Sequence, residues 1–376
     1  KNIILDIKNI DKWFGHVHAN QSVSIQIEKS TIHGIIGENG AGKSTLMSIV
    51  YGYYQADNGS IYVNGKEAFI SSPVQALNHG IGMVHQHFML VEPFTVLENI
   101  ILGAETGTIL ENSLQRARTE LKKLEENYSL NVDPDAIVGE LPVGIRQRVE
   151  ILKALYRGAD IFILDEPTGV LTPQEVEHLF KILRSLKKQG KTIILITHKL
   201  REIMDLTDNV TVMRQGKVVT NKATKETNKE ELAELMVGRS VILSVNKKEK
   251  KIGREILSVN NLTILDEKNI EKVKNISFNI HEGEIIGIAG VAGNGQTELL
   301  EALTGIRKIN DGTINFLNKT FDNSRPINAK EIRKDGLAHV PEDRQKMGLV
   351  TAFSANESGI LGYQDLSIYK GKIFLK

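Results

Sequence analysis

A glycine-rich string with one lysine stands at residues 37–45, which read GENGAGKST. It fits the spacing GxxxxGK followed by Ser or Thr, at Gly37, Gly42, Lys43 and Ser44, between an apolar segment and an apolar-periodic stretch. Glycines let consecutive backbone amides turn toward phosphate oxygens, and a helix that starts there adds its positive end. The string therefore predicts a phosphate-binding loop, in which Lys43 reaches the β- and γ-phosphates of a nucleotide.

Further groups in and after this loop complete the expected chemistry. Asn39, Gly40 and Thr45 are expected to add phosphate contacts from the same loop. Carboxylate and hydroxyl oxygens are ligands that Mg²⁺ prefers, so we expect the Ser44 hydroxyl to bind this ion.

Two adjacent carboxylates follow the apolar segment 161–164. Asp165 is expected to hold the same ion as the loop, directly or through water. Glu166 is then free to accept a proton from an attacking water. The pattern predicts nucleotide hydrolysis.

The elements that position these groups alternate along the chain. Strands are predicted at 3–7, 32–36, 161–164 and 192–196, with helices between them. This order indicates an α/β sheet that carries the phosphate loop at the carboxyl end of a strand. Apolar residues at helical spacing predict two amphipathic helices, one through Leu114, Ala117, Leu121, Leu124 and Tyr128 and one through Val176, Leu179, Phe180, Leu183 and Leu186.

Composition limits the class of protein. The 376 residues are 41% hydrophobic and 25% charged, which is typical of a globular chain with more than one domain. A net charge of +1 gives no reason to expect nucleic acid as a partner. The absence of cysteine excludes disulfides and thiolate metal sites. Without a long apolar run, we expect a soluble chain whose membrane role comes through a partner.

An internal repeat decides the predicted organisation. The string GIIGENGAGKSTLMSIVYG at 34–52 reappears as GIAGVAGNGQTELLEALTG at 287–305. We predict a first domain at 1–238, a linker at 239–255 and the N-terminal part of a second copy at 256–376. Glu342 takes the place of Gln86, so roughly 120 residues of the copy are expected to be absent.

The second phosphate loop differs chemically from the first. Gln296 replaces Lys43, while the glycines and Thr297 persist. A neutral amide cannot supply the cation, so we interpret the second loop as a phosphate cradle of low or no hydrolytic competence. A glycine turn kept only for packing is the alternative.

In combination, the motifs resemble a known family. The order of phosphate loop, Gln86, LPVGIRQR at 141–148, LDEPT at 164–168 and THK at 197–199 is similar to the ATP-binding subunits of ABC transporters. The repeat with a degenerate second loop resembles the fused double-ATPase subunit of bacterial importers for simple sugars and nucleosides. Its sequence looks more similar to the nucleoside branch. This resemblance implies a P-loop NTPase domain with a RecA-like core and a helical subdomain, a truncated second copy, and the cofactors ATP and Mg²⁺.

The resemblance also assigns roles to single residues. Phe14 matches the aromatic residue on which adenine stacks, with Trp13 as the rival and a core role as the alternative for either ring. Gln86 matches the glutamine that contacts Mg²⁺ and water and connects to the membrane subunit. His198 matches the histidine that contacts the γ-phosphate and orients the water with Glu166.

The signature segment matches the family with departures. Gly144 matches the glycine that contacts the γ-phosphate of an ATP held by an opposite domain. Pro142 stands where the family commonly has serine, and Thr172 stands near the place of a usual aspartate. These departures put the γ-phosphate contact in doubt and predict a protein that hydrolyses ATP at only one of two sites.

The expected function is ATP-driven import. ATP would close two ABC domains, from the same chain or another copy, and hydrolysis would reopen them. The partners implied are integral-membrane permease subunits and, indirectly, an extracytoplasmic solute-binding protein, at the cytoplasmic face of the membrane, with no nucleic acid. The alternatives are a soluble ABC ATPase that acts on ribosomes or DNA, and a nucleotide-binding scaffold without turnover.

Overall fold

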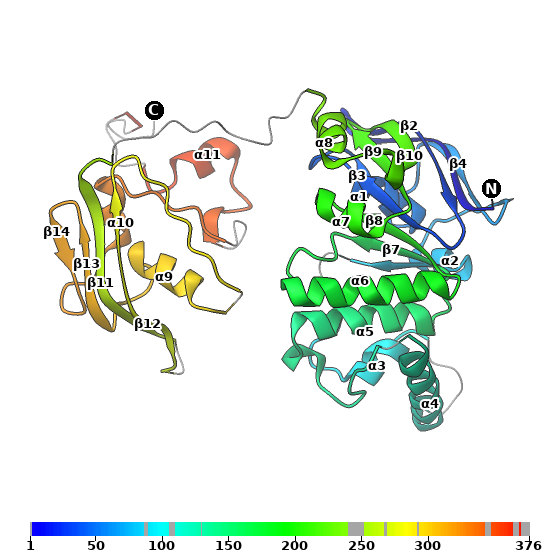
Figure 1. The fold of residues 1–376 in the computed structure, drawn as a ribbon, viewed down its shortest axis with the longest axis horizontal. Coiled ribbons are helices and arrows are strands. Elements are labelled where there is room, and N and C mark those ends of the chain that lie inside the picture. Colours follow the sequence, from blue (N-terminus) through cyan, green and yellow to red (C-terminus); the bar gives the residue numbers. More distant parts are fainter. Residues whose placement is uncertain are drawn as a thin grey trace. The chain divides into compact units, whose positions relative to one another are not determined.

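The chain forms two compact units, residues 1–245 and 246–376 (Figure 1). The computed structural model describes residues 2–85, 89–104, 110–128, 130–239, 252–266, 269–291, 293–342, 347–363 and 368–369.

An antiparallel sheet opens the first unit. It contains β1 (Ile3–Phe14), β2 (Val17–Glu28), β4 (Asn58–Val63) and β5 (Lys66–Glu67), in the order β2-β1-β4-β5. The predicted strand at 3–7 was too short, because β1 pairs with β2 along its whole length, from Ile3 with Glu28 to Phe14 with Val17.

The central sheet confirms the predicted α/β class. Its strands are β3 (Ile32–Ile36), β6 (Ile81–Val84), β7 (Ile161–Asp165), β8 (Thr192–Ile196), β9 (Asn209–Arg214) and β10 (Lys217–Ala223), in the order β10-β9-β3-β8-β7-β6. All neighbours pair in parallel except β9 and β10. Every residue of β3, β7 and β8 is buried, which explains their continuous apolar runs.

Helices cover the sheet and form a subdomain. The helices of the first unit are α1 (Lys43–Val50), α2 (Pro73–Asn78), α3 (Val96–Ile101), α4 (Leu110–Tyr128), α5 (Val143–Tyr156), α6 (Pro173–Lys188), α7 (Leu200–Leu206) and α8 (Lys229–Val237). Figure 1 shows α5 and α6 side by side, with α3 and α4 beyond α5. Ala117 and Leu121 of α4 are buried in the core that α4 shares with α3, α5 and α6. This confirms the predicted amphipathic helix.

Two apolar cores lie on the two faces of the central sheet. One core joins the sheet to α3, α4, α5 and α6. The other joins it to α1 and to the antiparallel sheet of β1, β2 and β4. Helix α6 is fixed at its start by a capping box, in which Thr172 accepts a bond from the Glu175 amide and the Glu175 carboxylate accepts from Thr172. Burial on both faces fixes the carboxyl ends of the parallel strands relative to each other.

The second unit repeats the antiparallel sheet. Strands β11 (Glu255–Leu265), β12 (Glu271–His281), β13 (Asp311–Phe316) and β14 (Lys319–Phe321) follow the order β12-β11-β13-β14, which matches β2-β1-β4-β5. Its described helices are α9 (Gln296–Leu303), α10 (Ala329–Lys334) and α11 (Ala355–Ile360). The repeat seen in the sequence is therefore a structural repeat in this part.

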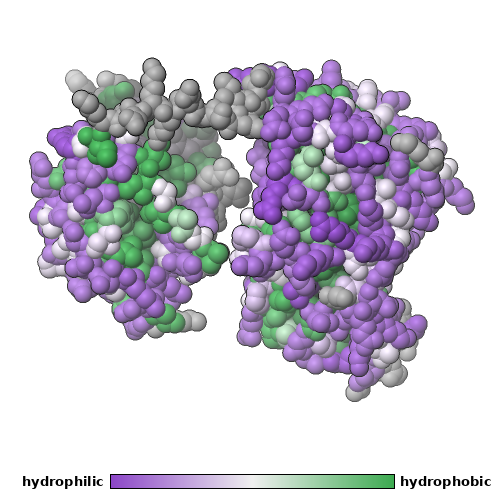
Figure 2. Space-filling view, in the orientation of Figure 1, coloured by the Kyte–Doolittle hydropathy of each residue, from purple (hydrophilic) through white to green (hydrophobic). Residues whose placement is uncertain are grey.

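The counterpart of β3 does not form a strand. In the first unit β3 lies between β8 and β9, whereas the described residues 284–290 pair with no strand. Ile285 is consequently 90% exposed, against 0% for Ile32. A band of apolar surface is visible on the second unit in Figure 2, while the face drawn for the first unit is mostly polar.

Within the described residues, no helix has both the length and the apolar character needed to cross a membrane.

The central strand β3 carries a buried histidine, and this makes stability depend on pH. His33 is fully buried, its Nε2 lies 2.7 Å from Thr211 Oγ1, and burial lowers the pKa of His33 to about 4. The unfolded chain binds the His33 proton more readily than the folded chain. Above pH ~6.5 His33 is neutral in both states and does not change the free energy of unfolding. Between pH ~6.5 and pH 4 the free energy of unfolding falls by about 1.4 kcal/mol per pH unit as the pH decreases.

We expect His33→Gln to remove this part of the pH dependence of the free energy of unfolding. Denaturant titrations at pH 7.5 and pH 5, followed by the fluorescence of Trp13, measure it, because Trp13 is the one tryptophan of the sequence and lies in the first unit. Equal pH dependence in both proteins would contradict the assignment to His33.

Candidate active site

The loop between β3 and α1 is shaped by glycines at defined backbone angles. Gly42 caps α1 with φ +93°, and its carbonyl accepts a hydrogen bond of 3.0 Å from the buried Asn20 Nδ2. A Cβ on Gly42 would clash with the carbonyl oxygen of Ala19. Gly40 also has a positive φ, +84°. Only glycine adopts such angles without strain, so the loop geometry follows from the predicted residues.

Lys43 is buried inside this loop. Its Nζ donates to the carbonyl oxygens of Gly37, at 2.8 Å, and Glu38, at 3.0 Å. Burial lowers the pKa of Lys43, and the nearby carboxylates of Glu166 and Asp165 oppose this shift. Thus the structure brings the Lys43 cation near the two carboxylates, from motifs far apart in the chain.

Ser44 and Asp165 lie together at the carboxyl edge of the sheet. Burial raises the pKa of Asp165, and a side-chain hydrogen bond with Ser44 acts in the opposite direction. Asp165 Oδ1 is buried and has no hydrogen-bond partner in the described structure. A hydroxyl beside a carboxylate with an unused oxygen is a donor set that fits Mg²⁺.

Glu166 and His198 form the second pair of the site. His198 Nδ1 lies 3.0 Å from Glu166 Oε1, although the two residues are 32 positions apart. The backbone of Glu166 is left-handed, with φ +46°, and its amide donates to the Ile196 carbonyl at 2.9 Å. A non-glycine residue in this region is strained and needs support from its surroundings. The structure thus brings the two predicted residues into contact, while the strained backbone had no sequence signal.

The two aromatic candidates differ in their surroundings. Trp13 stacks on His18, with ring centroids 4.0 Å apart and planes at 11°. Phe14 meets Tyr54 edge to face at 5.2 Å. Trp13 is 39% and Phe14 42% exposed, so the alternative of a core role is wrong for both rings. His18 covers one face of Trp13 in a near-parallel stack, whereas Phe14 has the edge contact with Tyr54 and Lys12 Nζ 5.5 Å from its ring centroid.

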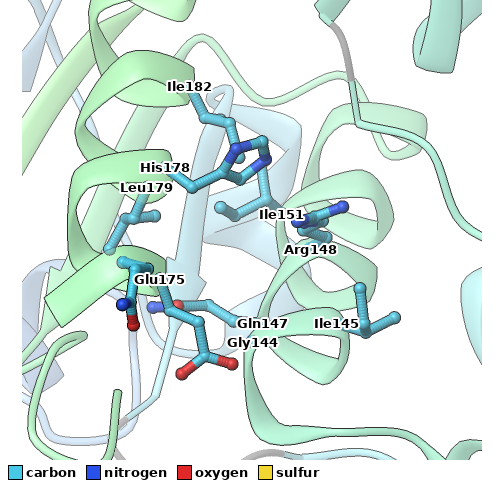
Figure 3. Close-up of a pocket in the computed structure, with 10 residues that line it drawn as sticks. Gly144, Ile145, Gln147, Arg148, Ile151, Glu175, His178, Leu179 and Ile182 are labelled. Atoms are coloured by element: carbon cyan, nitrogen blue, oxygen red, sulfur yellow. The ribbon is translucent and has the colours of Figure 1, made fainter. Parts of the chain in front are cut away.

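Gly144 lies in the first turn of α5, against a carboxylate. Helix α5 is preceded by Pro142 as its N-cap residue. A Cβ on Gly144 would lie 2.5 Å from Glu175 Oε1, and both residues line a cavity of about 270 Å³ between α5 and α6 (Figure 3). A larger residue here would therefore displace the Glu175 side chain, independently of any phosphate. The carboxylate also opposes an anion at this helix end.

Gln86, together with His87 and Phe88, lies outside the described residues. His85 and Met89, which flank these three residues in the sequence, line a groove of about 260 Å³ together with Tyr53. The Tyr53 hydroxyl lies 3.4 Å from His85 Nε2. The buried Glu150 lines the same groove, and burial raises its pKa.

The second loop keeps the glycine turn without the cation. Gly295 caps α9 with φ +95°, close to the value at Gly42. Gln296 Nε2 lies 3.5 Å from the Val291 carbonyl oxygen. Thr297 Oγ1 donates to Glu342 Oε2 at 2.9 Å, so a carboxylate meets the hydroxyl that corresponds to Ser44.

Two buried residues with backbone contacts in this unit were not predicted from the sequence. Asn20 braces Gly42, and the buried Gln147 of α5 donates to the Pro167 carbonyl at 2.8 Å. Asn20 has no motif around it. Gln147 is part of the LPVGIRQR string, but its partner is visible only in three dimensions.

Comparison with known proteins identifies the family. The ABC transporter family model matches residues 20–169 and 273–367. The guanosine import ATP-binding protein NupO of Bacillus subtilis is 46% identical to the chain over 380 residues, which cover 99% of this chain and 74% of that protein. The nucleoside import ATP-binding protein NupA of Lactococcus lactis is 46% identical over 355 residues, 94% of this chain and 70% of that protein.

More distant relatives and a solved structure agree. The galactose/methyl galactoside import ATP-binding protein MglA of Escherichia coli is 38% identical over 372 residues, 99% of this chain and 72% of that protein. The crystal structure of the ADP conformation of MJ1267, an ATP-binding cassette of an ABC transporter, superposes with a TM-score of 0.56 and 29% identity, over 64% of this chain and 100% of that one. With its P-loop fold and paired carboxylates, the chain belongs to the ABC transporter family and is one of its ATP-binding, ATP-hydrolysing subunits.

Proposed function

We propose that the chain energises the import of nucleosides. The observation that carries this proposal is the 46% identity to two nucleoside importers, against 41% for the glucose import ATP-binding protein TsgD13 of Haloferax volcanii and 38% for MglA of Escherichia coli. Simple-sugar import is the second candidate. The identity to those sugar importers favours it over the alternative of a soluble ABC ATPase that acts on ribosomes or DNA. The net charge of +1 also argues against a nucleic-acid partner.

The residues of the first loop hold ATP in this proposal. The amides of Asn39, Gly40 and Thr45, together with Lys43, bind the β- and γ-phosphates, and Phe14 stacks on adenine. Ser44 and Asp165, with Gln86, are the residues that would hold Mg²⁺, which supplies charge neutralisation at the phosphates when bound.

Glu166 and His198 carry the hydrolytic step. Glu166 accepts the proton of the attacking water, and His198, fixed by its 3.0 Å contact with Glu166, orients that water and the γ-phosphate. Preorganisation at this point is the main contribution that the protein makes to phosphoryl transfer.

The proposed partners follow from the names of the relatives, which are import ATP-binding proteins. Membrane permease subunits dock at the groove beside Tyr53, His85 and Met89, and an extracytoplasmic solute-binding protein delivers the nucleoside to them. The chain then lies peripherally at the cytoplasmic face. A second ABC domain presents ATP to Gly144, where Glu175 and Pro142 weaken γ-phosphate contact, so the two sites of the assembly differ in turnover.

We expect Glu166→Gln to abolish steady-state ATP hydrolysis and to leave Mg·ATP binding nearly unchanged, because the carboxylate acts on water. Lys43→Ala should weaken binding itself. Phosphate release and equilibrium titration with ATP separate the two effects. Binding with no Glu166-dependent hydrolysis, measured with the membrane subunits present, would instead support a scaffold without turnover.

We expect Phe14→Ala to reduce ATP affinity by about 5- to 160-fold, which corresponds to ~1 to 3 kcal/mol for lost stacking. Trp13→Ala is the matched control, and its affinity should stay within about twofold, because its ring already stacks on His18. A larger effect of Trp13→Ala, measured by competition with a fluorescent ATP analogue, would reverse the assignment.

Substrate class is tested by uptake. Cells whose only nucleoside importer contains this chain should take up labelled guanosine, lose uptake with Glu166→Gln, and show no competition from excess galactose. Competition by galactose but not by unlabelled nucleosides would favour the sugar alternative.

A further inference from the structure

The segments that follow Glu166 and His198 are tied to each other. Lys199 Nζ donates to Thr168 at both its carbonyl oxygen and Oγ1, at 3.0 Å each. The Thr168 hydroxyl donates to Glu202 Oε1, and Lys199 Nζ lies 3.6 Å from the same oxygen. Thr168 is 2% and Glu202 4% exposed, so these bonds form in an environment of low dielectric constant. These bonds fix the distance between the segment after Glu166 and the segment after His198.

Helix α5 reaches the same segment through one amide. Gln147 Nε2 donates to the carbonyl oxygen of Pro167, at 2.8 Å, and Gln147 is 3% exposed. Pro167 directly follows Glu166, whose φ of +46° is strained. Gln147 is one helical turn after Gly144, and both line the cavity in Figure 3. A shift at the start of α5 is therefore transmitted to the backbone next to Glu166.

We propose that Gln147 is a positioning residue, which couples the start of α5 to the alignment of Glu166 with His198 through Pro167 and the Thr168, Lys199 and Glu202 network. The inference rests on the proposed roles of Glu166 and His198. Gln147 acts through the carbonyl oxygen of Pro167 and not on the reacting atoms. It holds the carboxylate at the distance and angle that proton transfer needs, and a misplacement of about 1 Å can cost 100-fold in rate.

The network also explains how a strained residue persists. A left-handed Glu166 costs on the order of 1–3 kcal/mol and needs partners on both sides. The Ile196 carbonyl fixes its amide, while Gln147 and Lys199 fix the two carbonyls that follow. Removal of one of these hydrogen bonds lets the backbone of Glu166 relax toward a conformation with negative φ. This moves the Glu166 carboxylate away from His198.

The first test compares two substitutions of the same kind. Gln147→Met keeps the side-chain volume and removes the donor. Gln189→Met removes another glutamine bond to a backbone carbonyl, that of Asn127 at 2.7 Å, at the end of α6. We expect Gln147→Met to lower kcat at least about 10-fold with the ATP affinity within about twofold, and Gln189→Met to change neither.

A second readout needs no turnover. In protein labelled with ¹⁵N-histidine, the Nδ1 resonance of His198 reports its 3.0 Å contact with Glu166. Assignment comes from the His198→Gln variant. We expect Gln147→Met to shift this resonance and Gln189→Met to leave it in place. An unchanged resonance together with unchanged kcat in Gln147→Met would overturn the inference. So would a parallel loss of turnover and ATP affinity, because that marks general damage.

A third comparison tests the network behind Gln147. Thr168→Val is isosteric and removes both hydroxyl bonds, whereas Thr168→Ser keeps them. Thr168→Val should reproduce the kcat loss and the His198 shift, and Thr168→Ser should stay within about threefold of the wild type. The fold decrease in kcat of the double variant, Gln147→Met with Thr168→Val, should be smaller than the product of the two single fold decreases. Both substitutions act on the same alignment of Glu166 with His198. Full multiplicativity would contradict a shared network.

These outcomes separate the inference from the proposed function. If Glu166→Gln still hydrolyses ATP, the assignment of the proton acceptor is wrong, whatever the Gln147 variant does. If Glu166→Gln is inactive and Gln147→Met is fully active, the catalytic assignment stands and the coupling is wrong.

Discussion

The parallel pairing of three buried strands is the constraint on which the site depends. β3 pairs with β8, and β8 with β7, in registers that place Ile35 beside Ile196 and Ile196 beside Asp165. Parallel strands end at the same edge, so the phosphate loop after β3, the carboxylates after β7 and the histidine after β8 must meet there. A shift of one residue in any register would turn the side chains to the other face. The two apolar cores on either side of the sheet prevent such a shift.

Buried charged groups meet at this edge. Lys43 is buried against the carbonyls of its own loop, and Asp165 is buried against Ser44 with one oxygen unused. Each group carries a desolvation cost that an anionic nucleotide and a divalent cation would offset. In this arrangement phosphate would supply a partner for Lys43, and a metal ion would supply a partner for the unused oxygen of Asp165.

The second unit keeps the glycine turn next to an antiparallel sheet. Gly295 keeps the backbone angle of Gly42, and α9 starts as α1 does. The segment before the turn nevertheless has no partner strands among the described residues, and Ile285 is exposed. The left-handed turn and the helix start are supported by β12, because Gly295 lies against the Lys272 carbonyl and α9 packs on the antiparallel sheet. A parallel strand forms only when distant segments supply its hydrogen bonds.

The sequence by itself determined the α/β class, the phosphate loop, the adjacent carboxylates and the repeat. All of these are local patterns of residue type, and the long amphipathic helix at Leu110–Tyr128 was also predicted correctly for that reason. The tertiary structure alone decided the length of β1, the contact of Glu175 with Gly144, the strained backbone of Glu166 and the bond from Gln147 to Pro167. Each of these joins residues that are distant in sequence, or is held in place by such contacts. A pattern along the chain contains no information on the direction and distance between such groups, which are fixed only when the sheet and its helices pack.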